Sequence, residues 1–539
     1  MNRMIRRLSV ALLAMYLVLF VQLNNIQLFG AKRLKTNPDN NRSVLAALSK
    51  PRGPVVTADG VVVARSEQVP GSDKRRRVYP TADLFAHVVG YFSQNFGADG
   101  VERTYNKELA GETTDLKFQG LSDLFTTRDT TGTVGLTLRN DVQTVARDQL
   151  AGRRGSVVAL DPRTGEILAM YSNPSYDPNP VASLDPGVAT PAKKALDADP
   201  TKPLLARAYR EIFFPGSTFK VVTASAGLQS GRVTTDAPDF PRQKGYLLPL
   251  TTTTLSNFDA ATCGGTLFEV LRVSCNSAFA QMGAEEIGPE PMVERAQAFG
   301  FNSTPPIDLP AAAASQFPTD YGPKRMTVDQ YRARLNGQPA PTTTARVSPD
   351  SVVYIHDDSA KLAQVSIGQS DLRASPLQMA LVAGAIANKG VIMKPHVVRD
   401  VRASDGTVVD KVQVAPWRTA ITPEVAQTMH DAMLDVVANG TASRLAVEGF
   451  EVGGKTGTAQ LGTTPPRSHA WIIGFAGEPG QAPRVAVAVL VEGQEGSSEQ
   501  TGGRVAAPIA QAVLQAALAP PPLPPLPPLP PPSTTAGPR

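Results

Sequence analysis

The sequence has few cysteines and histidines, which limits the metal chemistry it can support. It contains two cysteines, Cys263 and Cys275, and five scattered histidines in 539 residues. The cysteine spacing fits no zinc signature and no pair of histidines flanks it, so we predict no metal site. Because no glycine-rich phosphate-binding loop is present either, ATP and NAD are poor candidates, and we expect no cofactor.

The chain also lacks a strong excess of charge of one sign. Its net charge of +5 is small for this length, and both signs are mixed along most of the sequence. The exception is the basic run Lys74-Arg75-Arg76-Arg77. A solvated loop explains so short a run better than a polyanion site does, and we predict no nucleic-acid partner.

Apolar sequence, by contrast, is plentiful. Hydrophobic residues make up 42% of the chain, which excludes wholesale disorder, and the length predicts two domains with appendages. Near the beginning, Arg3, Arg6 and Arg7 precede an apolar stretch over residues 8–29. This stretch is about long enough to cross a bilayer as a helix, for which roughly 20 residues are needed.

Two interpretations of this stretch remain. A cleaved signal peptide would have a shorter apolar core and a small-residue cleavage site, and Gly30-Ala31 is a poor one. We favour an uncleaved single-pass anchor over 8–29 with a cytoplasmic tail over 1–7, because positive charge tends to stay on the cytoplasmic side. The rest of the chain would then lie outside the cell membrane.

Export would decide whether the two cysteines can form a disulfide. In an oxidising compartment Cys263 and Cys275 can form a disulfide, and the short loop that it closes would contribute about 3 kcal/mol in the chain-entropy description. The alternative is two free buried thiols, since cysteine is often buried without being bonded.

The pattern divides the remaining chain into four parts. They are a polar linker over 30–50, a first domain over 51–133, a second domain over 134–518 and a disordered proline-rich tail over 519–539. The first domain mixes helical pieces with short strands, including a hairpin around Asp59-Gly60. We refer to these two units as the first and second domains.

The second domain has strands at both of its ends. A hairpin is predicted over 156–171, helices over 376–388 and 423–437 fill the middle, and strands return over 451–491 before a last helix over 504–518. This order predicts one sheet whose strands come from distant parts of the chain, with helices on its faces.

Three short motifs carry the candidate chemistry, and the first is Ser217-Thr218-Phe219-Lys220 after Pro215-Gly216. At the start of a helix, Ser217 and Lys220 share one face of the first turn. A serine hydroxyl becomes a good nucleophile beside a base, and a lysine can be that base if burial or a nearby cation keeps it neutral. Alone the motif is a weak signal, and a helix cap with an exposed lysine is the alternative.

The other two motifs follow in the chain. Ser274-Cys275-Asn276 consists largely of ordinary loop residues and is weak by itself. Lys455-Thr456-Gly457-Thr458 is more specific, because glycine lets a ligand approach a strand edge closely. A cation and two hydroxyls along that edge suit a substrate carboxylate.

In this order and context, the three motifs resemble those of class B penicillin-binding proteins, and most of all the PbpA-like group of actinobacteria. Further segments of the second domain resemble the family at Ser172–Asn179, Ser366–Gln369, Ser375–Ala380, Met393–His396 and His469–Trp471, and those of the first domain at Tyr79-Pro80, Ala86–Gly90 and Gly100–Tyr105. The resemblance covers about residues 50–518. It implies an α+β fold, with an antiparallel sheet between helices on both faces and a mixed α/β pedestal before it.

The resemblance also implies a function and residue roles. The protein would be a peptidoglycan D,D-transpeptidase without a glycosyltransferase domain, in which Ser217 attacks the penultimate D-Ala carbonyl of a stem peptide and Lys220 takes its proton. Lys455 would keep Lys220 neutral and orient Ser274, which relays the proton to the departing D-Ala. Asn276 would hold the peptide amide.

The lysine motif would complete the site. By the same resemblance, the N–H groups of Ser217 and Thr458 form the oxyanion hole, the Thr456 and Thr458 hydroxyls bind the terminal carboxylate, and Gly457 lets the substrate lie along the strand. β-Lactams should acylate Ser217. The implied partners are the stem peptides of a lipid-linked precursor polymer, a multi-span membrane glycosyltransferase and a division or elongation complex.

Three alternatives share parts of this pattern. A D,D-carboxypeptidase or β-lactamase uses the same motifs, but the Glu-x-x-Leu-Asn box of class A β-lactamases is missing from the sequence. A non-enzymatic antibiotic sensor would retain acylation without turnover. A scaffold protein would have lost the chemistry, which the intact motif set argues against.

Overall fold

The computed structural model describes residues 2–25, 50–117, 129–339, 352–494 and 500–521. Helix α1 (Asn2–Asn25) contains a candidate membrane span over Arg3–Asn25, with a mean hydropathy of 2.0. Length and composition therefore support the predicted apolar helix. Its expected last residues, 26–29, and most of the predicted linker and tail lie outside the described residues.

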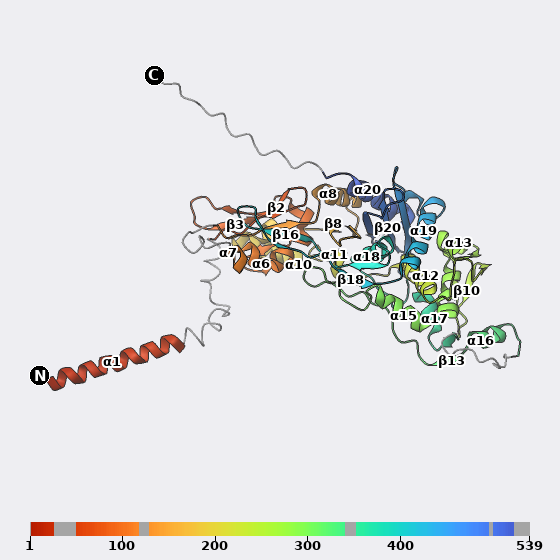
Figure 1. The fold of residues 1–539 in the computed structure, drawn as a ribbon, viewed down its shortest axis with the longest axis horizontal. Helices are drawn as coiled ribbons and strands as arrows, with labels where there is room; N and C mark the ends of the chain where they lie inside the picture. The colour runs from red at the N-terminus through yellow and green to blue at the C-terminus, as the bar shows by residue number, and fades with distance from the viewer. Residues whose placement is uncertain (1, 26–49, 118–128, 340–351, 495–499, 522–539) are drawn as a thin grey trace, which may run out of the picture.

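The first domain is built on a six-stranded sheet in the order β17-β16-β6-β1-β2-β3. Its strands are β1 (Val55–Val56), β2 (Val62–Gln68), β3 (Arg75–Val78), β6 (Thr133–Leu136), β16 (Val398–Arg402) and β17 (Val408–Lys411). Strands β1 and β2 are antiparallel, which confirms the hairpin around Asp59-Gly60. β16 and β17 come from within the range expected for the second domain, so the two units share a sheet (Figure 1).

Short helices follow β3 along the chain. They are η2 (Ala82–Phe85), α4 (Ala86–Val89), α5 (Gly100–Thr104), α6 (Asn106–Leu109) and α7 (Thr114–Lys117), with a small ribbon of β4 (Phe92–Ser93) and β5 (Gly97–Ala98). In their midst the fully buried carboxylate of Glu102 accepts from Arg52 at 2.7 Å and from Arg77 at 2.5 Å. Burial opposes its charge, but the two guanidinium groups outweigh burial and lower the pKa of Glu102.

The second domain is organised around a five-stranded antiparallel sheet in the order β19-β20-β21-β7-β8. Its strands are β7 (Gly155–Leu160), β8 (Ile167–Asn173), β19 (Glu451–Gln460), β20 (Ser468–Gly477) and β21 (Val485–Val491). Strands from both ends of the domain therefore lie side by side, which confirms the predicted sheet. The three inner strands are buried along their whole length, as expected for a sheet covered on both faces.

Helices cover both faces of this sheet (Figure 1). On one face α8 (Asn140–Leu150) and α20 (Ala507–Leu518) pack against each other and against the strands, and on the other face the wholly buried α18 (Pro376–Ala387) lies across them. The predicted last helix divides into a π-helical turn, η9 (Gly502–Ala506), and α20. Helix α19 (Pro423–Asn439) packs against the edge strand β19.

The remaining elements lie between residues 178 and 445 of the chain. The helices are α9 (Pro178–Val181), α10 (Pro186–Ala198), α11 (Arg207–Arg210), η4 (Gly216–Phe219), α12 (Lys220–Gln229), η5 (Phe258–Ala260), α13 (Leu267–Arg272), α14 (Asn276–Gln281), η6 (Met282–Ile287), α15 (Pro289–Ala298), α16 (Val328–Leu335), α17 (Ser359–Val365) and η8 (Ser443–Leu445). The strands are β9 (Phe240–Gln243), β10 (Gly245–Leu247), β11 (Thr254–Ser256), β12 (Cys263–Gly265), β13 (Lys324–Thr327), β14 (Tyr354–His356), β15 (Val391–Met393) and β18 (Pro416–Thr419).

Candidate active site

The serine motif begins on a tight turn that is wedged between two other segments. Gly216 has φ +55°, and its amide donates to the Gly368 carbonyl at 3.0 Å. A side chain on Gly216 would come within 2.8 Å of the Thr458 carbonyl, and one on Gly368 within 1.9 Å of the Gly216 carbonyl. Glycine is therefore required at both positions, and the turn brings Ser217 next to strand β19.

Ser217 and Lys220 lie three residues apart, on two helical elements that follow each other directly. Ser217 is in the 3-10 turn η4 and is half-buried, whereas Lys220 opens α12 and is completely buried. The sequence predicted a regular first helical turn, and the structure has a tighter one. Its Thr218 hydroxyl donates to the Pro215 carbonyl at 2.8 Å, which fixes the turn from its own residues.

The amine of Lys220 is directed at the second motif. It donates to the Ser274 carbonyl and to the Asn276 side-chain oxygen, both at 2.7 Å, and lies 3.3 Å from the Ser274 hydroxyl. It also sits over the ring of Phe279, 5.4 Å from the centroid. The structure thus brings the first two motifs into direct contact, although 54 residues separate Lys220 from Ser274.

Lys455 approaches the same hydroxyl from the third motif. Its amine donates to the Ser274 hydroxyl at 2.8 Å and to the Thr456 carbonyl at 2.9 Å. Ser274 has φ +58°, a conformation that is uncommon outside glycine, and backbone hydrogen bonds from Ser274 to Leu271 and from Cys275 to Val270 hold it there. One hydroxyl therefore lies between two lysine amines.

Burial controls the charge of these two amines. Burial, with the positive charge of Lys455 as a second cause, lowers the pKa of Lys220 well below its ordinary value. Burial lowers the pKa of Lys455 to about 7. Among the described residues no carboxylate pairs with either amine. A neutral Lys220 beside a more readily charged Lys455 is the arrangement that base catalysis by lysine needs.

These shifts predict a stability that rises with pH. A lysine in an unfolded chain has a pKa of about 10.4, whereas folded Lys455 has a pKa of about 7. Between these values the unfolded state binds more protons, so the free energy of unfolding increases with pH, by up to about 1.4 kcal/mol per pH unit for one lysine.

We expect Lys455→Met to reduce this slope in guanidinium titrations between about pH 7.5 and 9. Lys411→Met, at an exposed position, should not change the slope. An unaltered slope in Lys455→Met would mean that the buried amine stays charged.

Strand β19 carries the whole lysine motif, as expected for a cation and two hydroxyls along a strand edge. Glycine weakens the local strand signal, but the pairing with β20 demands it, since a side chain on Gly453 would meet the Phe475 ring at 2.3 Å. Likewise a side chain on Gly457 would lie 2.9 Å from the Pro215 carbonyl. Close packing therefore overrides propensity in this strand.

The two threonines of the motif differ in environment. Thr456 is buried, and its hydroxyl lies 2.7 Å from the hydroxyl of Thr441, just after α19. Thr458 is half-buried. Thr441 and Gly368 are site residues that motif reasoning missed. In the sequence, Ser366–Gln369 is recognisable only as a segment that resembles the family, and no local pattern distinguishes Thr441.

A disulfide joins Cys263 and Cys275, so the structure has the bonded form of the two alternatives. Cys275 is buried between the two polar residues of its motif. On the following residue, the Asn276 amide donates to the Ser256 carbonyl at 3.2 Å. The bond ties the second motif to β12 and the neighbouring β9–β11 ribbons.

We expect removal of this bond to affect both stability and acylation. The cysteines are 12 residues apart, a loop length for which a disulfide contributes about 3 kcal/mol. The double variant Cys263→Ser/Cys275→Ser should unfold at lower guanidinium concentration, with its free energy of unfolding reduced by about 2–3 kcal/mol. It should also react more slowly with a fluorescent penicillin, because Ser274 and Asn276 lose a support. The control Ser230→Ala, just after α12 and away from the second motif, should behave as wild type. Unchanged acylation in the double variant would limit the bond to a role in stability.

Comparisons with known proteins agree with this geometry. The family of penicillin-binding protein transpeptidase domains matches residues 155–515, and that of penicillin-binding protein A dimerisation domains matches residues 52–134. The chain is 38% identical to the peptidoglycan D,D-transpeptidase PbpA of Mycolicibacterium smegmatis, over 96% of this chain and 99% of that protein. It is 36% identical to PbpA of Mycobacterium tuberculosis, with the same coverage.

Solved structures show the same fold. The ceftriaxone acyl-enzyme complex of penicillin-binding protein A from M. tuberculosis superimposes with a TM-score of 0.74 and 34% identity, over 88% of this chain and all of that one. PBP2 of Pseudomonas aeruginosa gives a TM-score of 0.66 at 28% identity, over 87% and 95% of the two chains. With these matches spanning both domains, the chain belongs to the class B penicillin-binding proteins, in the PbpA-like group.

Proposed function

We propose that the protein is a peptidoglycan D,D-transpeptidase that works through an acyl-enzyme on Ser217. The observation that carries the proposal is the Ser274 hydroxyl between two buried amines, 2.8 Å from Lys455 and 3.3 Å from Lys220, beside the turn that holds Ser217. The mycobacterial relatives bear the name of this activity, and a solved relative was trapped as a ceftriaxone acyl-enzyme.

In the acylation step, neutral Lys220 takes the proton of the Ser217 hydroxyl as its oxygen attacks the penultimate D-Ala carbonyl. The peptide bond to the terminal D-Ala then breaks, and its nitrogen receives a proton through the Ser274 hydroxyl. The products are an ester on Ser217 and free D-Ala. A lysine base is effective here because burial and Lys455 disfavour its charged form.

The backbone and the lysine motif stabilise the negative charge of the oxyanion and of the terminal carboxylate during this step. We assign the oxyanion to the N–H groups of Ser217 and Thr458, on segments that the Gly216 contact holds together. The terminal carboxylate faces the charge of Lys455 and the half-buried Thr458 hydroxyl. Because the Thr456 hydroxyl already contacts Thr441, we give Thr456 a supporting role through Thr441 rather than a direct one.

Cross-linking follows when the amine of a second stem peptide attacks the ester. The amine loses a proton, a new peptide bond forms, and the Ser217 hydroxyl is restored with a proton returned through Lys220. We assign Asn276, which accepts from Lys220 and donates to the Ser256 carbonyl, the role of holding the donor amide near the ester.

The domain division and the setting are part of the same proposal. We assign 51–133 with β16 and β17 to a pedestal and 134–518 to the transpeptidase domain. Helix α1 would anchor the chain with its basic end in the cytoplasm. A multi-span membrane glycosyltransferase within a division or elongation complex would supply the glycan strands, since polymerised and cross-linked products require both reactions.

The test is the fate of a D-Ala-D-Ala donor peptide with the purified full-length protein. We expect D-Ala release to rise when an amine acceptor is added, with a new donor–acceptor product in the mass spectrum. Release that is independent of acceptor and yields only the shortened donor would identify a carboxypeptidase. Acylation by penicillin without any donor turnover would identify a sensor.

A further inference from the structure

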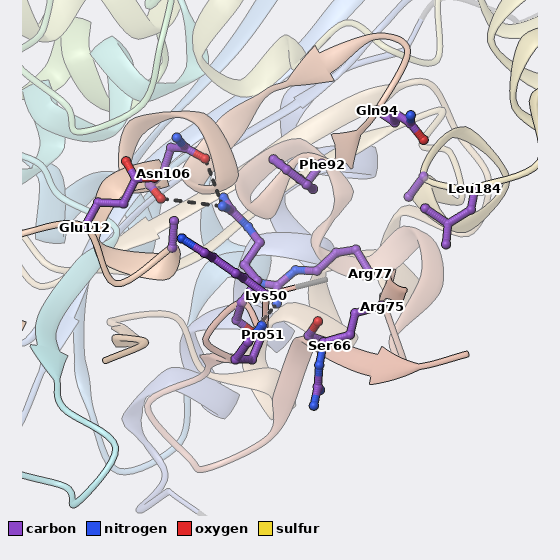
Figure 2. A pocket seen from close by; sticks show the side chains of 13 residues that line it. Lys50, Pro51, Ser66, Arg75, Arg77, Phe92, Gln94, Asn106, Glu112 and Leu184 are labelled. Atoms are coloured by element: carbon purple, nitrogen blue, oxygen red, sulfur yellow. Dashed lines mark hydrogen bonds between the residues drawn. The ribbon is translucent and has the colours of Figure 1, made fainter. Parts of the chain in front are cut away.

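The first domain contains a cavity that the proposed transpeptidase activity does not use. It has a volume of about 340 Å³ and is lined by residues of the sheet, of the short helices and of the segment before α10 (Figure 2). Its size is that of a small-molecule site. No catalytic residue proposed above lines it.

Strand pairing explains why this cavity is basic. In the antiparallel pair of β2 and β3, Ser66 lies opposite Arg77, and Arg75 is two residues away on the same face. All three line the cavity. Arg76, between the two arginines, pairs with Glu67 at 2.8 Å instead. The basic run noticed in the sequence is therefore divided, and half of it faces the cavity.

The charge of the lining is strongly positive. Four cationic side chains line the cavity, Lys50, Arg52, Arg75 and Arg77, against one carboxylate, Glu112. The buried Glu102 is already engaged by Arg52 and Arg77. Within the described part of the chain, neither Lys50 nor Arg75 has an ion-pair partner. An unneutralised basic cavity favours an anionic occupant.

Arg77 adds to the positive charge of the cavity wall. Arg77 is 6% exposed, and its Nη2 has no hydrogen-bond partner among the described residues, although its other nitrogens bond Glu102, Arg52 and Gly53. Buried donors are almost always satisfied in folded proteins. Because Nη2 is not accessible to solvent, Arg77 contributes positive charge to the cavity wall and no direct contact.

The opposite wall is apolar. Phe92 lines the cavity with its ring under the Arg52 guanidinium, 4.2 Å from the centroid, and Leu184 lies on the same side. Figure 2 shows Arg75 and Ser66 together on one side of the cavity, and Phe92 and Leu184 on the other. The site therefore combines a place for an anion with a surface for a hydrocarbon group.

We propose that this cavity binds a phosphate ester carried on an apolar chain, with the phosphate at Arg75 and the chain against Phe92 and Leu184. Phosphate fits better than a carboxylate because the lining carries four cations against one carboxylate, and a phosphate monoester carries up to two negative charges. A lipid headgroup and a soluble phosphate ester share this chemistry. The proposal is independent of the transpeptidase function.

The probe is farnesyl phosphate, titrated calorimetrically into the full-length protein in detergent, with farnesol as the uncharged match. We expect farnesyl phosphate to bind and farnesol to bind much more weakly. Arg75→Ala should raise the dissociation constant of farnesyl phosphate about tenfold, because one charge-assisted contact is lost. Arg65→Ala is the control, because it removes the same charge from an exposed arginine on β2 that pairs with Glu67 outside the cavity.

Competition separates the two sources. The affinity for farnesyl phosphate would be compared between nanodiscs of phosphatidylcholine alone and nanodiscs that also contain phosphatidic acid. Weaker binding in the presence of phosphatidic acid would identify a lipid headgroup as the natural ligand. Equal binding would identify a soluble phosphate ester. Equal weakening by Arg75→Ala and Arg65→Ala would overturn the proposal, as would no binding or equal binding of farnesol. Unchanged thermal unfolding and penicillin labelling of both variants would show that the two domains remain folded.

Discussion

Ser217→Ala should be a folded protein that forms no covalent adduct with β-lactams. Without the hydroxyl oxygen no ester can form, so the penicillin mass increment on the peptide containing residue 217 should disappear from the mass spectrum. Cross-linking of stem peptides should fall by at least about 10⁴-fold, the usual scale for loss of a nucleophile. Because Ser217 is only half-buried, thermal unfolding should change little.

The matched control is Ser225→Ala on the same segment. The Ser225 hydroxyl is buried and donates to the Val221 carbonyl at 2.7 Å, so its loss perturbs α12 without touching the reacting groups. This variant should acylate at the wild-type rate. Persistent labelling of Ser217→Ala would place the nucleophile elsewhere and remove the basis of the proposed mechanism.

The second large effect is expected for Lys220→Met. Methionine fills a similar volume without an amine, so the Ser217 hydroxyl loses its base and Ser274 loses one of its two lysine neighbours. We expect the second-order rate constant for penicillin acylation to fall by about 10²–10⁴-fold, the range for a lost general base. Stopped-flow measurements with a fluorescent penicillin would determine this rate.

Two further measurements make the Lys220 result interpretable. Lys194→Met, at an exposed site on α10, should leave the rate unchanged. The residual rate of Lys220→Met should rise with pH as hydroxide replaces the missing base. If Lys220→Met kept more than about a tenth of the wild-type rate, the base would not be Lys220, since general-base catalysis contributes at least about 10²-fold.

How much of the site was predictable differs from motif to motif. The pair Ser217 and Lys220 could be recognised because their roles depend on a three-residue spacing within one turn. The sheet order was predictable in outline, since hairpin signals at 156–171 and strands over 451–491 left few alternatives. β16 and β17 were not assigned to the first sheet, because strand pairing across more than 250 residues leaves no local periodicity to read.

The sequence by itself determined which chemical groups this protein has. Its motifs supplied a hydroxyl, two amines and an amide, its apolar run supplied a candidate anchor, and its similarity to known proteins identified the family. These properties are local, since each depends on residue type and short spacing.

Only the tertiary structure decided the state of those groups. Lys220 becomes a base because packing removes water from it and brings Lys455 to the same hydroxyl. Likewise the run 74–77 acquires a binding face because pairing with β2 separates Arg75 and Arg77 from Arg76. Burial, charge proximity and strand register arise from contacts between distant segments, and a one-dimensional pattern does not contain them.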